Sequence, residues 1–147
     1  EPVLAPWVKR LPADVQFRRI PVQFSSQWTG TSKVWYTLEG LNAERLVPAV
    51  FNAIHNQNLR LDQEKPFVDW AATQGLDRKK VEDMYNSFAV NGKVARAKSL
   101  VQAYGVQSVP AFVVDGKYTT DTGQAKRHED TPPLLDKLIE KARAERK

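Results

Sequence analysis

The sequence predicts an α/β fold in which a block of helices interrupts a small β-sheet. Residues 15–24 are predicted to form a half-buried strand, because Ile20, Val22 and Phe24 alternate with Arg19, Pro21 and Gln23. Residues 25–104 show helical spacing and capping residues but no strand signal. Residues 111–120 join an apolar run to an Asp-Gly pair and a second extended run, which is typical of a β-hairpin. The predicted order is therefore helix, strand, helical block, hairpin and helix.

Length and composition limit the possible classes of protein. The 147 residues suffice for one domain, or for a small domain with an insertion. No apolar stretch approaches the ~18–20 residues that span a bilayer, and the start of the chain does not resemble a signal peptide. Because it opens on Glu1 rather than Met, we expect a processed or partial chain. It contains no cysteine, which excludes disulfides, thiolate metal sites and thiol catalysis by these residues alone.

The net charge of +5 raises the question of an anionic partner. The basic residues are spread along the chain and many lie near acids, as where Arg78-Lys79-Lys80 precedes Glu82-Asp83. This distribution favours a solvated surface over a nucleic-acid footprint, and we expect no nucleic-acid partner. A basic nucleic-acid binder is kept as a third hypothesis, which salt-sensitive binding would support.

Local signals define the first two elements. Residues 1–11 are predicted to be helical because apolar side chains recur at three- and four-residue spacing, although Pro2 and Pro6 make an unusual start. Pro21 lies within the predicted strand at residues 15–24 and cannot donate a hydrogen bond to a neighbouring strand. We therefore expect an edge strand there.

Four helices are predicted within the helical block from caps and stop signals. Asn42 is the expected N-cap of a helix through Ile54, with Pro48 at a kink or in the first turn. The second helix is expected to begin after an N-cap at Asp62 and to end at Gly75. The third is expected to follow an N-cap at Asp77 and to run through Tyr85, and the last spans residues 90–104 and ends at Gly105.

The C-terminal part is predicted to be a hairpin and a helix. Residues 111–114 form the first strand, Asp115-Gly116 the turn, and residues 117–120 the returning strand. Thr131 is the expected N-cap of the closing helix, with Pro132 at its first helical position. Apolar residues at helical spacing should face inward, namely Leu134, Leu135, Leu138 and Ile139.

Three stretches fix the order of the predicted parts over nearly the whole chain. They are VQFRRIPVQF (15–24), DMYNSFAV followed by KVARA (83–97), and GVQSVPAFVVDGKY (105–118). This ordered set resembles the DsbA family of bacterial periplasmic thiol:disulfide oxidoreductases, which have a thioredoxin fold with a helical insertion. The resemblance implies a thioredoxin-like domain made of residues 1–24 and 105–147, and a helical insertion made of residues 25–104.

The chain departs from the family pattern at its start. The family has a central strand that leads into a Cys-x-x-Cys pair at a helix start, and residues 1–7 resemble the continuation of that helix. The resemblance thus implies that the central strand and both cysteines lie upstream of Glu1 and are missing from this chain. Two strand edges would then lack their shared neighbour, so we expect the isolated chain to be unstable, to swap strands in a dimer, or to pair those strands directly.

The resemblance also implies which residues form the site. Val109-Pro110 would be a cis peptide next to the family's cysteines, with Pro110 as the proline of the catalytic loop. Ser108, Val109 and Pro110 would bind substrate, since the backbone at Val109 would be open to an extended polypeptide. A trans turn before a strand is the alternative for Pro110, and a simple turn residue is the alternative for Ser108.

Other candidates have plainer interpretations. By resemblance Arg19 would pair with a buried acid, whereas a solvated charge at a strand edge is the favoured alternative. His55 and His128 lack a second ligand at metal-binding spacing, so no metal or other cofactor is predicted. For four further aromatic residues, packing in the core is favoured: Trp28, Trp35, Tyr36 and Trp70. Trp28 is also a candidate for an exposed position in a groove beside the site.

The function implied by the resemblance is disulfide formation in secreted proteins in the periplasm. Its partners would be unfolded or reduced secreted polypeptides and a membrane quinone-linked protein that restores the disulfide. Since the reaction needs thiols, this chain alone is not expected to be redox-active. The alternative is a non-catalytic thioredoxin-like module that binds extended peptides without turnover.

Overall fold

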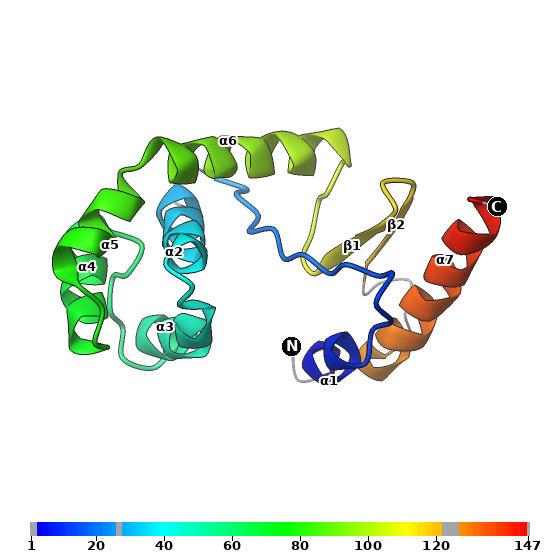
Figure 1. Cartoon of the computed structure of the whole chain (residues 1–147), viewed down its shortest axis with the longest axis horizontal. Coiled ribbons are helices and arrows are strands. Elements are labelled where there is room, and N and C mark those ends of the chain that lie inside the picture. Colours follow the sequence, from blue (N-terminus) through cyan, green and yellow to red (C-terminus); the bar gives the residue numbers. More distant parts are fainter. Residues whose placement is uncertain (1–2, 26–27, 122–126, 147) are drawn as a thin grey trace. The chain divides into compact units, whose positions relative to one another are not determined.

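The structure is a computed structural model that describes residues 3–25, 28–121 and 127–146. Its α-helices are α1 (Leu4–Lys9), α2 (Thr29–Gly40), α3 (Val47–His55), α4 (Glu64–Thr73), α5 (Arg78–Tyr85), α6 (Phe88–Ala103) and α7 (Thr131–Glu145) (Figure 1). The described residues also form two strands, β1 (Ala111–Val114) and β2 (Tyr118–Asp121), and two 3₁₀ turns, η2 (Glu44–Leu46) and η3 (His128–Asp130). The chain divides into unit 1, residues 1–19 and 102–147, and unit 2, residues 20–101.

Unit 2 is built around α2, which is buried on two sides. One side packs Val34 and Leu38 into the larger core, which includes Phe67 of α4 and Val81 of α5. The other side places Tyr36 in a second cluster formed mainly by α6; its other buried members are Val90, Val94 and Ala97. Because α2 has apolar neighbours on both sides, it is the central helix of this unit.

Gly30 allows α2 to approach the loop before α4 very closely. A Cβ atom at Gly30 would lie 1.8 Å from the backbone carbonyl oxygen of Asp62. No side chain fits there, since the group in the way is backbone that cannot rotate aside. The contact therefore requires glycine for a packing reason.

The predicted capping residues have mixed outcomes. Asp77 caps α5 as expected, since its carboxylate accepts a hydrogen bond from the Lys80 backbone N–H at 3.0 Å. The prediction for Asn42 is wrong, because it adopts φ +54° in the turn after α2 and its backbone N–H donates to Glu39. The prediction for Asp62 is also wrong, because its carboxylate binds the Arg60 guanidinium, at 2.9 and 2.8 Å, and the helix begins at Glu64.

The helix boundaries that were predicted from proline and glycine agree better with the structure. Pro48 lies in the first turn of α3, where its missing N–H costs no helical bond. Gly75, with φ +90°, follows the end of α4, and Gly105 follows the end of α6. Helix α6 begins two residues earlier than predicted, because the Ser87 hydroxyl accepts from the Val90 backbone N–H at 3.1 Å.

Unit 1 contains the predicted hairpin and closing helix. Strands β1 and β2 pair antiparallel, with Val114 opposite Tyr118. Asp115 and Gly116 both have positive φ, at 55° and 67°, as the turn between twisted strands requires. Helix α7 packs against β1. Thr131 is its first residue rather than its cap, and the Thr131 hydroxyl is buried without a hydrogen-bond partner among the described residues.

The predicted strand at residues 15–24 is not formed. Residues 15–23 have no regular secondary structure, and within the described ranges β1 and β2 are the only paired strands. An alternating sequence becomes a strand only when a neighbour accepts its backbone hydrogen bonds, and no such neighbour is present in the described part. Of its apolar residues, Ile20 and Phe24 are exposed, and the others are partly buried.

We expect Gly30→Ala and Gly92→Ala to change stability in opposite directions. Both glycines lie in helices, but Gly92 has no atom within 4 Å of the position of a Cβ. Gly30→Ala should lower the free energy of unfolding by about 1–3 kcal/mol through the clash with Asp62. Gly92→Ala should raise it by roughly 0.5–1 kcal/mol through helix propensity. Urea unfolding followed by circular dichroism checks both; equal effects would contradict the close contact.

Candidate functional site

An exposed loop connects α6 to β1 in unit 1. The Val109-Pro110 peptide bond is cis, so the expectation of a cis peptide at this position is confirmed. Residues 107–110 are all exposed, and the Val109 side chain retains 49% of its accessible surface. The loop therefore presents both its backbone and an apolar side chain to solvent.

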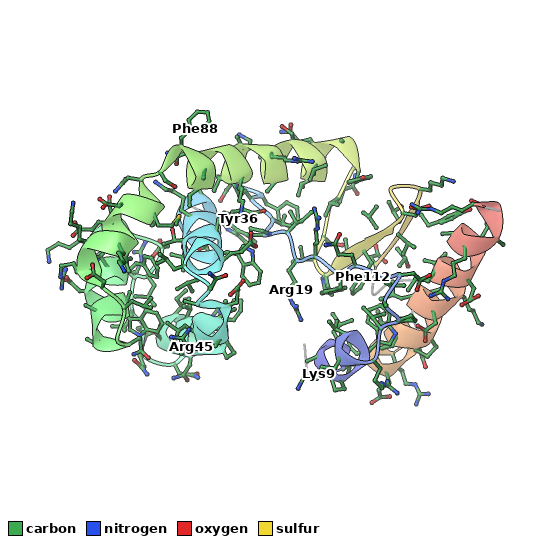
Figure 2. All side chains as sticks on the ribbon, in the orientation of Figure 1. Lys9, Arg19, Tyr36, Arg45, Phe88 and Phe112 are labelled. Carbon is green, nitrogen blue, oxygen red and sulfur yellow. The ribbon has the colours of Figure 1, made fainter. Side chains whose placement is uncertain are left out.

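Strand β1 continues this loop and has an open edge. One edge pairs with β2, while no other strand among the described residues pairs with the opposite edge. Val109 in the loop and Val113 in β1 are both exposed apolar residues. Figure 2 shows Phe112, which belongs to the other face of the strand, on the ribbon of β1. The loop and strand thus form an apolar surface beside unpaired backbone.

Two side chains lie near the hairpin turn that follows the loop and β1. The Tyr104 hydroxyl, at the end of α6, lies 3.5 Å from where a Cβ at Gly116 would be. Helix α6 therefore ends beside the hairpin turn within unit 1. Arg146, which directly follows α7, forms an ion pair with Asp115 in the same turn. This ion pair ties the turn to the end of α7.

Helix α7 also binds β2 and the N-terminal segments. The Tyr118 hydroxyl donates to the Glu145 carboxylate, and Lys117 pairs with the same carboxylate at 3.5 Å. The Trp7 indole N–H of α1 donates to Asp136 at 2.8 Å. Arg143 makes two hydrogen bonds to Asp14, at 2.9 and 2.8 Å, in the turn after α1. One helix thus joins the hairpin to both N-terminal segments of unit 1.

These pairings shift the acid–base equilibria of the carboxylates. The Arg143 hydrogen bonds hold the pKa of Asp14 below its usual range, and Arg146 lowers the pKa of Asp115 in the same way. The Tyr118 hydroxyl lowers the pKa of Glu145, and that carboxylate raises the pKa of Tyr118. All three carboxyl groups are solvent-accessible, so their charges are partly screened.

The other candidate polar residues lie elsewhere. Arg19 is exposed and its guanidinium carbon lies 4.9 Å from the centre of the Phe17 ring (Figure 2). His55 stacks on the exposed Phe51 ring at 6.2 Å, and His128 lies in η3. Within the described ranges no three His, Cys, Asp or Glu residues are grouped so as to hold a metal ion. The part of the chain that is described also contains no helix long and apolar enough to cross a membrane.

The aromatic residues divide into core and surface. Tyr36 is buried, and Trp35 and Trp70 pack partly buried against the two core clusters of unit 2. Trp28 is instead 43% exposed and lies against Phe24, with ring centres 5.6 Å apart. The sequence analysis missed the exposed Phe24 and Phe88 as surface residues. Phe88 is 92% exposed and points away from the start of α6 (Figure 2).

The fold and loop define a thioredoxin-like protein, helix-rich with a small two-stranded sheet. The family model of the DSBA-like thioredoxin domain matches residues 5–130. The chain belongs to this family. It is 43% identical over 145 residues to the thiol:disulfide interchange protein DsbA of Pseudomonas aeruginosa, covering 98% of the chain and 69% of that protein. Its identity to the DsbA of Pseudomonas syringae is 41%, with 98% and 68% covered.

Solved structures agree with this assignment. The crystal structure of Pseudomonas aeruginosa DsbA matches with a TM-score of 0.92 and 42% identity, covering 97% of this chain and 75% of that one. The oxidoreductase NmDsbA3 from Neisseria meningitidis matches with a TM-score of 0.87 and 26% identity, covering 99% and 78%. These relatives support a function in disulfide interchange.

Acid should weaken unit 1, and Asp115→Asn should reduce that effect. A carboxyl group whose pKa is lowered on folding stabilises the folded state at pH values above its unfolded pKa of about 4. This stabilisation is lost as the pH falls through the lower pKa that the group has in the folded state. We therefore expect the melting temperature to fall between about pH 6 and pH 3, and to fall less in Asp115→Asn. Thermal circular dichroism measures both.

The matched control for this experiment is Glu44→Gln. Glu44 is an exposed carboxylate in η2 of unit 2 and forms no ion pair with the described residues. This variant should keep the acid sensitivity of the original chain. An Asp115→Asn variant that loses as much melting temperature as the original chain would contradict a stabilising role for the ion pair with Arg146.

Proposed function

We propose that this chain acts in disulfide formation in secreted proteins and that the loop at Ser108, Val109 and Pro110 binds the polypeptide substrate. The observation that supports this best is the exposed loop with its cis Val109-Pro110 peptide bond, which leads into β1. The substrates are unfolded or reduced secreted polypeptides, and the compartment is the periplasm. A membrane quinone-linked protein is the proposed partner that restores the disulfide.

Substrate binding would occur by strand addition. An extended polypeptide can hydrogen-bond to the exposed backbone at Val109 whatever its sequence, which suits a protein that acts on many substrates. The Val109 and Val113 side chains add an apolar surface for the substrate side chains. Folded proteins rarely offer an unpaired strand, so this mode of binding selects unfolded ones.

The redox step needs a thiol pair that these 147 residues do not contain. Disulfide exchange proceeds by attack of a thiolate on a disulfide, and no other side chain substitutes for it. We propose that Pro110 shapes the catalytic loop, while the chemistry belongs to cysteines outside the given residues. The chain alone therefore binds substrate but does not oxidise it.

Unit 2 offers further apolar contacts for an unfolded chain. We propose residues 25–104 as the helical insertion, and residues 1–24 and 105–147 as the thioredoxin-like domain. The Phe24–Trp28 pair and Phe88 are exposed aromatic side chains in unit 2. Exposed aromatic side chains are frequent anchors for partner chains.

A second candidate function is that of a peptide-binding module without catalysis. The absence of cysteine from the sequence favours it. Both candidates share the binding surface at Val109 and differ in whether the protein turns over substrate. Peptide binding and redox turnover therefore need separate measurements.

Val109→Asp should weaken binding of an unstructured peptide, because a charge replaces an apolar contact in the exposed loop. The expected loss of affinity is about fivefold to tenfold, which is equivalent to about 1–1.4 kcal/mol. Val109→Thr is the matched control, since it keeps the branched shape without a charge, and it should bind nearly as well as the original chain. Fluorescence anisotropy with a labelled, cysteine-free unstructured peptide measures both. Equal affinity for all three proteins would place substrate binding elsewhere.

Insulin reduction by dithiothreitol should proceed at the uncatalysed rate in the presence of the 147-residue chain. The chain has no thiol to exchange, so it cannot shorten the lag before the insulin chains precipitate. Turbidity records the reaction, and a cysteine-containing thioredoxin-like protein serves as the positive control. A shortened lag would contradict both the assignment of catalysis to outside cysteines and the peptide-binding alternative.

A further inference from the structure

Unit 2 contains an open hollow of about 570 Å³ that is separate from the loop at residues 105–110. It lies between α3, the segment at residues 56–63, and α4. The volume falls within the range of about 300–1,000 Å³ that is usual for sites of small ligands. Its lining residues are Ala49, Asn52, Gln57, Leu59, Leu61, Pro66, Asp69, Trp70, Thr73 and Gln74.

Helical spacing explains why these side chains meet. Pro66, Asp69, Trp70 and Thr73 recur at three- and four-residue steps, so they form one stripe along α4. Ala49 and Asn52 are likewise three residues apart on α3. The hollow therefore has two helical walls.

Trp70 provides a flat apolar wall. Its ring stacks on Phe67, with ring centres 6.4 Å apart and planes 25° apart, and Phe67 is fully buried in the core. The indole is thus anchored from the protein side while it also lines the hollow. A fixed indole ring is a platform for ligands that have an apolar face.

The charge in the hollow is already balanced. Asp69 alone among the described lining residues is charged, and it binds Lys65 at 2.9 Å and Arg78 at 2.6 Å. These hydrogen bonds hold the pKa of Asp69 below its usual value, so the carboxylate stays ionised and paired. A cationic ligand finds no free carboxylate in this wall, and an anionic ligand finds no free cation.

The remaining polar groups are three amides that can still bond, and the Thr73 hydroxyl, which donates to the Trp70 carbonyl at 2.6 Å. The Asn52 carboxamide oxygen accepts from Asn56 at 2.7 Å, which leaves the Asn52 N–H groups to donate. The Gln57 side chain has no hydrogen-bond partner among the described residues. The Gln74 amide donates to Thr73 at 3.4 Å, which leaves its carbonyl oxygen as an acceptor. Both donors and acceptors therefore line the hollow.

We propose that this hollow binds a neutral saccharide. Sugar hydroxyl groups both donate and accept hydrogen bonds, and the C–H face of a pyranose ring packs against an indole. A neutral, amide-lined site with one anchored indole matches these two properties, whereas it offers nothing specific to charged ligands. The site is a binding site only, and it is independent of the proposed peptide loop.

NMR titration of the full ¹⁵N-labelled chain tests the proposal. The probes are chitotriose, cellotriose and maltotriose, each to about 20 mM, which is enough to detect the millimolar affinity usual for a few hydrogen bonds. We expect at least one of them to shift the Trp70 indole N–H signal with saturation. Asn52→Ala and Gln74→Ala should each weaken that binding by about threefold to tenfold.

The controls distinguish binding at this site from nonspecific binding. Gln102→Ala removes an exposed amide on α6 outside the hollow and should leave the titration unchanged. Absence of a Trp70 shift with all three sugars would overturn the proposal. Wild-type affinity in both Asn52→Ala and Gln74→Ala would overturn it too, as would stronger binding of spermidine, trigalacturonate or an unstructured peptide at the same signals.

Discussion

The arrangement of unit 1 depends on the polar contacts of α7. Among the described residues its sheet has two strands, and such a hairpin is marginal by itself in water. Helix α7 compensates by contacting three separated segments: α1 through Trp7, the following turn through Asp14, and the hairpin through Tyr118. The loop at residues 105–110 runs into that hairpin, so its position depends on the same contacts. Most of these ion pairs are exposed and individually weak, but together they define one arrangement.

The fold was predictable where the information is local. Asp77 caps its helix, and Asp115-Gly116 forms its turn, because each depends on residues two to four positions away. Asn42 and Asp62 have equally suitable side chains, yet one occupies a left-handed turn and the other binds Arg60. The alternation at residues 15–24 also predicts a strand that does not form, since a strand depends on a partner elsewhere in the chain. Non-local competition therefore explains the failures.

The candidate site shows the same division. The proline loop was predicted because a contiguous stretch, Ser108 to Tyr118, resembles a known family. The exposure of Phe24 and Phe88 was not predicted, and that of Trp28 was only the less favoured alternative, because an aromatic residue at helical or strand spacing looks like a core residue in sequence. The amide-lined hollow was also invisible, since its walls come from α3, α4 and the segment between them. Surfaces assembled from several segments need the structure.

We propose that substrate binding and thiol chemistry depend on different parts of the protein, because these 147 residues contain no cysteine and yet present an exposed proline loop. Strand addition uses backbone groups and apolar side chains, which the exposed loop and β1 possess. Thiol exchange uses a lowered thiol pKa at a helix start, which no residue here can supply. The two requirements place different demands on the sequence: the first on the loop geometry around Val109, the second on a pair of side chains. A chain that meets the first alone should recognise unfolded polypeptides and release them unchanged.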